Sequence, residues 1–206
     1  MMCKTLKCFV LLATFLIGCS KNGPCPDKSD YVGGAPGKNT KQWCEKQLAN
    51  GRVVKDGPYY VWYSATQKKV EGSYKEGKKE GIWTEFHANG KKKSQGSWKN
   101  NKKEGKWTYW NKASNKTLEG AFSQDKRTGV WTAWFENGKK KDVGSWKNGE
   151  PTGKWTYFHK NGKHKSEGNR NAKGKTGLWT YYYPNGAKSE TGSHGGKKGE
   201  KIGEWE

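Results

Sequence analysis

The sequence lacks most of what builds a globular enzyme. Hydrophobic residues make up only 31% of the 206 residues, which is little for a thick core. No stretch has apolar residues at the spacing of an amphipathic helix, so we expect no helices. No nucleophile, paired carboxylate or phosphate-binding glycine motif recurs at a fixed position. We therefore expect an all-β protein that is not an enzyme and needs no cofactor.

Long apolar runs are also scarce, and the clearest one lies near the start of the chain. It extends from Phe9 to Ile17, follows Lys4 and Lys7, and is too short to span a bilayer. This pattern is typical of a signal peptide, which we place at residues 1–18. The ending Leu-Ile-Gly-Cys resembles the bacterial lipobox, and the resemblance implies acylation of Cys19, including palmitate. An ordinary secretory signal is the alternative.

A lipidated Cys19 would attach the protein to a membrane of the bacterial envelope. Ser20 follows the cysteine, and by analogy with enterobacterial sorting this residue favours the outer membrane. The sequence does not indicate which leaflet or surface would carry the protein. We therefore expect an envelope lipoprotein that reaches the membrane through its N-terminal anchor.

Cysteine is rare after this point, because only Cys25 and Cys44 follow Cys19. Two cysteines in an exported chain are typically joined, so we predict a Cys25–Cys44 disulfide rather than two free thiols. Closing this short loop should stabilise the fold by about 3 kcal/mol.

From Gly57 onward the chain is a tandem repeat with a constant step of 24 residues. The opening glycine of each copy recurs at Gly57, Gly81, Gly105, Gly129, Gly153 and Gly177. A second glycine follows 15 positions later, at Gly72, Gly96, Gly120, Gly144, Gly168 and Gly192. Such periodicity means one supersecondary unit copied in series. After the signal peptide we assign a tether and leading segment at 19–56, repeats at 57–80, 81–104, 105–128, 129–152, 153–176 and 177–202, and a partial copy at 203–206.

Each copy predicts a β-hairpin. A Gly-x-Trp-Thr-x-aromatic strand leads to Asn-Gly, as at Asn89-Gly90, where we expect a two-residue turn with positive φ. A return strand and a looser Lys/Asn/Gly loop then lead to the next copy.

This turn sets the register. It places His87 opposite Lys92 and Trp83 opposite Gly96, and a symmetric connection also brings Trp83 beside Gly72. By the same count, Trp98 lies between Gly81 and Gly105. We therefore expect each aromatic ring to lie over glycines on both neighbouring strands.

These residues carry a family resemblance. The pattern G-x-W-T-x-[FWY], N-G-K, G-x-[WYF] and N-G-K over residues 57–206 resembles the MORN-repeat group, in the variant found in YwqK-family antitoxins. The resemblance implies an elongated, single-layer, twisted antiparallel sheet. The antitoxin label suggests binding and inhibition of a toxin, which for an exported lipoprotein would be an envelope immunity role.

The segment before the repeats is ambiguous. Residues 20–40 are rich in Ser, Lys, Asn, Gly and Pro, and this composition predicts a tether. Thr40–Asn50 has Cys44 and Leu48 at helical spacing, yet Gln42-Trp43-Cys44 resembles a return strand. We favour a degenerate leading strand, with the disulfide pinning the tether across the first sheet edge.

Lysines recur eleven positions after the opening glycines, at Lys68, Lys92, Lys116, Lys140 and Lys188. In the derived register this lysine row lies on the Trp83 face, roughly one residue per 10 Å. Removing Lys4 and Lys7 lowers the net charge only from +21 to +19. The row either keeps the sheet soluble or binds a polyanion such as lipopolysaccharide, an acidic lipid or a glycosaminoglycan. Nucleic acid ranks low, because an exported protein rarely meets it.

The histidines offer little metal chemistry. His159 and His164 are expected to lie opposite each other across a turn, which supplies two ligands where structural zinc normally takes four. We expect no metal site. Three functions stay open: a protein-binding scaffold with an unidentified envelope or extracellular partner, a polyanion-binding ribbon, and a structural spacer.

Overall fold

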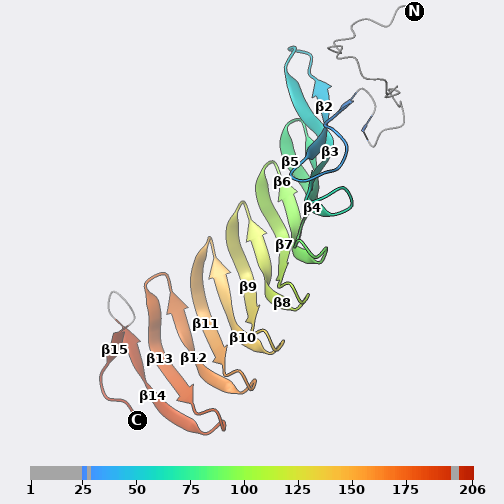
Figure 1. Cartoon of the computed structure of the whole chain (residues 1–206). Coiled ribbons are helices and arrows are strands. Elements are labelled where there is room, and N and C mark those ends of the chain that lie inside the picture. Colours follow the sequence, from blue (N-terminus) through green and yellow to red (C-terminus); the bar gives the residue numbers. More distant parts are fainter. Residues whose placement is uncertain (1–24, 27–28, 196–199) are drawn as a thin grey trace, which may run out of the picture.

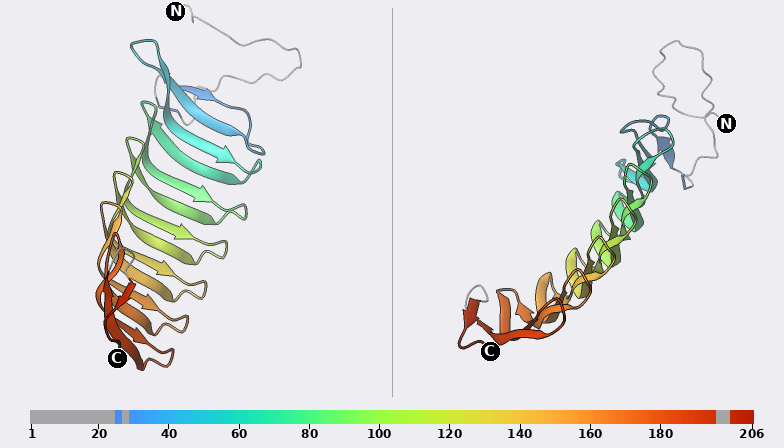
Figure 2. Two further views of the ribbon diagram at one scale, coloured as in Figure 1. Left: turned by 90° about the vertical axis from the view of Figure 1, so that its left-hand side faces the viewer. Right: turned by 60° about the horizontal axis from the view of Figure 1, so that its bottom comes forward.

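The computed structural model describes residues 25–26, 29–195 and 200–206. The described residues form one open antiparallel sheet of 15 strands, in which every strand pairs with its neighbours in sequence (Figure 1). The sheet is long, twisted and a single layer thick (Figure 2). The predicted fold is therefore confirmed. The predicted signal peptide and Cys19 lie outside the described residues.

The strands alternate in direction along the ribbon. They are β1 (Asp30–Val32), β2 (Lys41–Gln47), β3 (Val53–Trp62), β4 (Lys68–Lys75), β5 (Lys78–Phe86), β6 (Lys92–Lys99), β7 (Lys102–Trp110), β8 (Lys116–Ser123), β9 (Lys126–Trp134), β10 (Lys140–Lys147), β11 (Glu150–Phe158), β12 (His164–Asn171), β13 (Gly174–Tyr182), β14 (Lys188–Gly195) and β15 (Glu200–Ile202). Within the described ranges, no helix has the length and apolar character needed to span a bilayer.

The Asn-Gly segments form longer loops than the sequence predicted. His87 N–H donates to Lys91 O at 2.8 Å, and Gly90 N–H donates to His87 O at 3.0 Å. The loop therefore has three residues, with φ positive only at Gly90 (83°), which is a type I turn followed by a left-handed glycine. The two-residue turn predicted here is wrong, and His87 lies opposite Lys91 instead of Lys92.

Asparagine recurs in these loops because its side chain joins successive repeats. Asn89 Nδ2 donates to Lys112 O in the next loop at 2.9 Å, while Asn89 Oδ1 accepts from Lys91 N–H at 3.2 Å. Asn137 and Asn161 make the same contacts to the following copies. The asparagine is thus needed for its amide and has ordinary φ.

The two-residue turns occur instead where we expected looser loops. Lys99 pairs with Lys102, and between them Asn100 and Asn101 have φ of 51° and 66°. Both central residues of a type I′ hairpin turn need positive φ. Three further turns share this geometry, at residues 76–77, 124–125 and 148–149.

The opening glycines form bulges. Gly96 pairs with Trp107 but Ser97 pairs with Glu104, so two residues of β7, Gly105 and Lys106, have no partner on β6. Gly105 has φ of 64°, and no other atom would lie within 4 Å of a Cβ there. Trp98 consequently faces Lys103 on this side, and the predicted cover of Gly105 by Trp98 is wrong.

The second glycines make room for tryptophan rings. The predicted pairing of Trp83 with Gly96 is confirmed. However, a Cβ on Gly96 would lie 2.2 Å from Trp107 Cδ2, and one on Gly72 would lie 2.2 Å from Trp83 Cδ2. Each tryptophan therefore covers one glycine on the preceding strand, where we had expected two.

Both ends of the sheet continue the same plan. β2 confirms the leading strand, and a Cys25–Cys44 disulfide joins the segment before β1 to the buried centre of β2. At the other end, the Trp205 ring lies over Gly192, and Glu206 exchanges backbone hydrogen bonds with Thr191.

Candidate binding faces

The sheet has two chemically distinct faces. We define the tryptophan face by Trp83, Trp107, Trp131, Trp155 and Trp179, whose exposed fractions are 5% or less. We define the threonine face by the residues that follow them, Thr84, Thr108, Thr132, Thr156 and Thr180. Side chains alternate across a strand, so adjacent residues point to opposite faces.

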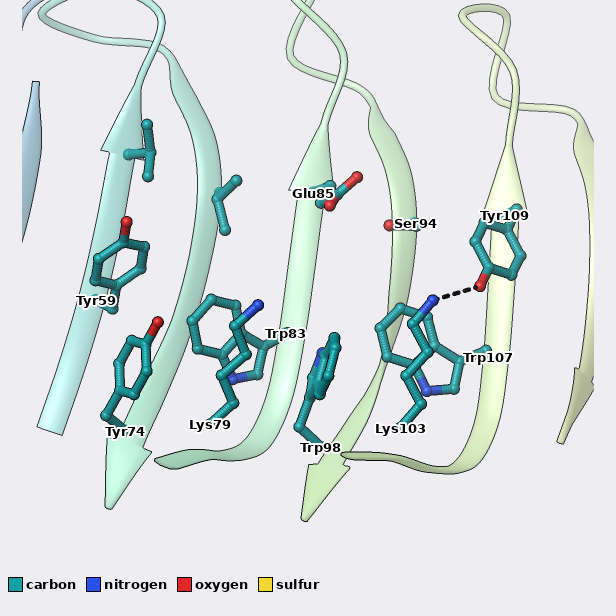
Figure 3. Close-up of a pocket in the computed structure, with 12 residues that line it drawn as sticks. Tyr59, Tyr74, Lys79, Trp83, Glu85, Ser94, Trp98, Lys103, Trp107 and Tyr109 are labelled. Carbon is teal, nitrogen blue, oxygen red and sulfur yellow. Dashed lines mark hydrogen bonds between the residues drawn. The ribbon is translucent and has the colours of Figure 1, made fainter. Parts of the chain in front are cut away.

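The tryptophan face is layered with cations. Lys79 Nζ lies 4.4 Å from the ring centroids of both Trp83 and Trp98, and Lys103 Nζ lies 4.3 Å from Trp107 (Figure 3). Each contact is worth roughly 0.5–2 kcal/mol, depending on how far the cation is desolvated. Burial lowers the pKa of Lys79, and neighbouring Lys103 adds to this effect.

The same arrangement recurs along the sheet. Cations at the equivalent position, two residues before each opening glycine, are Lys55, Lys79, Lys103, Arg127 and Lys175. A shallow groove of about 270 Å³ lies between Tyr59 and Tyr109 on this face (Figure 3). The cations of the groove already lie against its aromatic rings, so we interpret the groove as part of the side-chain packing and not as a ligand site.

One repeat breaks the pattern. Pro151 occupies the cation position there, and Arg170 from the following strand lies over Trp155 instead, at 4.9 Å. Arg170 itself stands where other copies have an aromatic ring, as at Trp98.

The threonine face carries the lysine row, contrary to the prediction. Phe86 pairs with Lys92 and Glu85 with Ser94, so Lys93 is an extra residue that reverses the alternation. Lys93 Nζ lies 3.6 Å from Glu85, a residue of the tryptophan-face groove. The expected placement of Lys68, Lys92, Lys116, Lys140 and Lys188 beside Trp83 is therefore wrong.

Neighbouring groups satisfy much of this row. Lys68 and Lys116 each donate to a glutamate three residues later at 2.9 Å, and Lys92 donates to Gln95 at 3.1 Å. Burial by itself would raise the pKa of Glu119, but hydrogen bonds from Lys116, Lys106 and Thr108 hold it below its usual value. The row is thus less available for an external polyanion than the sequence suggested.

Apolar side chains are exposed on the same face. Ile82, Val130 and Leu178 are 57%, 60% and 62% exposed. The two equivalent positions between them hold Lys106 and Lys154, which pair with Glu119 at 3.2 Å and Glu167 at 2.8 Å. Apolar and charged sites therefore alternate from one repeat to the next, about 10 Å apart.

A row of half-buried aromatic residues lies on the same face, four residues further along the strands and beyond the threonines. They lie opposite the lysine-row positions in the ladder: Trp62, Phe86, Trp110, Trp134, Phe158 and Tyr182. Sequence reasoning missed this row because it assigned the opposing residues by a turn one residue too short.

His159 and His164 do not face each other. His159 Nε2 lies 2.8 Å from Tyr182 O in the next repeat, while His164 pairs with Phe158. The predicted His159–His164 pair is therefore wrong. Across the described ranges, no group of three or more His, Cys, Asp or Glu side chains is placed to hold a metal ion.

Comparison with known families identifies the repeat. The MORN repeat variant model matches residues 79–100, 127–148, 151–172 and 175–193. No curated protein matches the chain. The unmatched hairpin formed by β7 and β8 has the same tryptophan, glycine and cation positions, with Trp107 over Gly96 and Lys103 over Trp107. These four segments of the chain are therefore MORN-like repeats.

Proposed function

We propose that the chain is a non-enzymatic binding module that holds a protein partner on its threonine face. The observation that carries this proposal is the set of exposed aliphatic side chains at Ile82, Val130 and Leu178, on the face that also carries a row of half-buried aromatic residues. Exposed apolar side chains set among polar groups are typical of protein–protein interfaces. Repeat proteins commonly use one extended face in this way.

The charge of the face indicates the kind of partner. The chain has 40 basic and 19 acidic residues, and the lysine row borders the aromatic row on this face. An extended protein segment with acidic and apolar side chains complements both features. Electrostatic attraction would speed association, and burial of the aliphatic residues would supply the affinity.

The repeat supplies its own test variants. Lysine already occupies the Val130 position in two other copies, at Lys106 and Lys154, so Val130→Lys and Leu178→Lys should leave the fold intact. Each removes an apolar contact and should weaken partner binding by about 1–2 kcal/mol. Lys106→Gln is the matched control and should change binding little. Capture from envelope extract that is equal for the wild type and for the Val130→Lys, Leu178→Lys double variant would refute the proposal.

We extend the proposal to an envelope-anchored protein with a lipid on Cys19. The lipobox resemblance and the short apolar run before it support this placement, most simply in the outer membrane. Replacing Cys19 with Ala should release the protein from membranes and abolish labelling with palmitate. Membrane association that survives this change would remove the anchor from the proposal.

The resemblance to YwqK-family antitoxins suggests one form of this function, inhibition of a toxin met in the envelope. A captured partner whose toxicity is suppressed by the wild type and not by the Val130→Lys, Leu178→Lys variant would establish an immunity role. If the captured partner is not toxic, the proposed function is that of a protein-binding scaffold.

Polyanion binding by the lysine row is the second candidate. It is favoured by the continuity of the row along one face and by the net charge of +21. Changing Lys68, Lys92, Lys116, Lys140 and Lys188 to Gln should abolish retention on heparin or lipopolysaccharide, and such binding should weaken steeply with salt. Unchanged retention would eliminate this candidate. A protein that binds neither partner class would act as a spacer.

A further inference from the structure

A second site lies on the opposite, tryptophan face, in the copy that departs most from the repeat. In three other copies the aromatic of a return strand pairs directly with the cation of the next strand, as Trp98 does with Lys103. In β12 and β13 the corresponding pair is Arg170 and Lys175. Like charges directly opposite in a sheet destabilise it, so this pairing is costly unless something compensates it.

Loss of the aromatic ring leaves space. A pocket of about 520 Å³ is lined by Tyr157, Lys165, Ser166, Arg170, Gly174, Lys175, Tyr181 and His194. This volume is in the range of small-molecule sites. The lining contains three side chains that carry positive charge and no carboxylate.

The cations of this pocket are held by neutral groups. Arg170 Nη1 donates to the Tyr157 hydroxyl at 2.8 Å, and Lys175 Nζ donates to the Tyr181 hydroxyl at 2.7 Å. Neither residue forms an ion pair with any carboxylate in the described part of the chain. Among the acidic side chains nearby, Glu190 pairs with Lys201 at 3.0 Å. Burial raises the pKa of Asp142, although the charges of Lys141, Arg170 and Arg127 act to lower it.

Positive charge predominates around Lys175. Burial lowers the pKa of Lys175, the charges of Arg170, Lys165 and Lys201 lower it further, and Glu190 acts in the opposite direction. The positive charges of Arg170, Lys175 and Lys165 would attract an anion, and a bound anion would in turn stabilise these charges.

The pocket also has defined walls. Ser166 lies between Tyr157 and Tyr181 in the ladder, paired with both. Ser166 is 4% exposed, so the small side chain forms the floor between two phenol rings. The cationic groups and the Tyr157 hydroxyl thus border a space wide enough for a group with several oxygens, while the Tyr181 hydroxyl is hydrogen-bonded to His194 Nε2 at 2.7 Å.

We propose that this pocket binds a phosphate or sulfate ester of a small molecule or sugar. Arg170, Lys175 and Lys165 would contact the oxyanion, and the Tyr157 and Tyr181 rings would flank the group attached to it. The site goes beyond the proposed protein-binding function, since it lies on the other face of the sheet and uses none of the same residues.

Titration calorimetry with inorganic phosphate, inorganic sulfate, glucose 6-phosphate and glucose, at constant ionic strength, tests the proposal. We expect saturable binding of the phosphate ester with Kd of about 1 mM or below, and none of glucose. Binding of phosphate and sulfate alike would identify the oxyanion as the recognised group, whereas preference for the ester would assign a contribution to the phenol rings.

Two variants locate the site. Arg170→Trp restores the ring that other copies have at this position, so it should fold and should weaken binding by at least roughly tenfold. Lys175→Gln should have a similar effect, while Lys103→Gln, its equivalent three repeats earlier, should have none. If Arg170→Trp fails to fold, Lys175→Gln still decides the question. No saturable binding up to about 10 mM, or equal binding by the Lys175→Gln and Lys103→Gln variants, would overturn the proposal. Val130→Lys should leave anion binding unchanged, which separates this outcome from failure of the protein-binding function.

Discussion

Replacing Gly96 with Ala tests the central packing feature of the sheet. The added Cβ would lie 2.2, 2.3 and 2.4 Å from three atoms of the Trp107 indole. Ordinary contact begins near 3.4 Å, so the ring has to move by more than about 1 Å. The neighbours leave little room for this movement.

The cost can be worked from what holds the ring. Trp107 is 4% exposed, lies 5.8 Å from the Trp98 ring and 6.1 Å from the Phe122 ring, and donates Nε1–H to Ser97 O at 3.1 Å. Displacing it forfeits part of these contacts and its contact with Lys103. Overpacking of this severity should cost about 2–4 kcal/mol.

Gly105→Ala is the matched control. It adds the same methyl group where no atom lies within 4 Å, and its cost comes only from the positive φ of 64°. That cost should be about 1–2 kcal/mol. Urea unfolding followed by circular dichroism compares the two variants, and hydrogen exchange of β6 and β7 shows whether the loss is local, as expected in a repeat array.

Double variants identify the ring responsible. In a Trp107→Ala background, Gly96→Ala should cost less than about 1 kcal/mol, because the colliding ring is gone. In a Trp83→Ala background its cost should be unchanged. Relief by Trp83→Ala, or a smaller effect for Gly96→Ala than for Gly105→Ala, would refute the assignment of one ring to each glycine.

Three further changes test separate features. Ser114 holds φ of 72° where other copies have glycine, so Ser114→Gly should raise the free energy of unfolding by about 1 kcal/mol in urea titrations; a loss of stability would contradict this. Cys25→Ser should lower the urea midpoint by an amount equivalent to about 3 kcal/mol at the N-terminal end, matching the effect of a reductant on the wild type, and no change with either would show that the disulfide is not stabilising. A hydrogen bond from Lys154 lowers the pKa of Glu167 below 4.5, so its stabilisation is present above pH 4.5 and is lost as the pH falls through the lowered pKa; Lys154→Gln should flatten the acid side of the stability profile, and an unaltered profile would exclude the pair as its cause.

Much of the fold follows from local sequence. The 24-residue step with strand-forming residues determines a series of hairpins, and the pairing of Trp83 with Gly96 follows from counting across the loop. A three-residue loop and the extra residue Lys93 compensate for each other, so this count gives the right pair although the turn type was wrong. The disulfide between Cys25 and Cys44 likewise followed from their being the two cysteines left after Cys19.

The faces could not be assigned in this way. One extra residue in a strand breaks the alternation between the residues on its two sides, so the bulge at Lys93 puts Lys92 on the threonine face while Gly96 stays opposite Trp83. Positive φ at Asn100 and Asn101 likewise depends on the twist of the strands they join. The exposure of Ile82, Val130 and Leu178 on one face follows from the pairing of their strands with both neighbouring strands.

The sequence by itself therefore determined the repeat, the hairpins and the tryptophan–glycine pairing, because these depend on residue type and spacing along one chain segment. Tertiary structure decided which glycine each ring covers, which face carries the charges, and that Arg170 stands opposite Lys175 beside an open pocket. These features depend on the β-bulges and on which neighbouring strand each side chain points towards. Such displacements of one residue leave the repeat pattern unchanged but change the face on which nearby side chains lie.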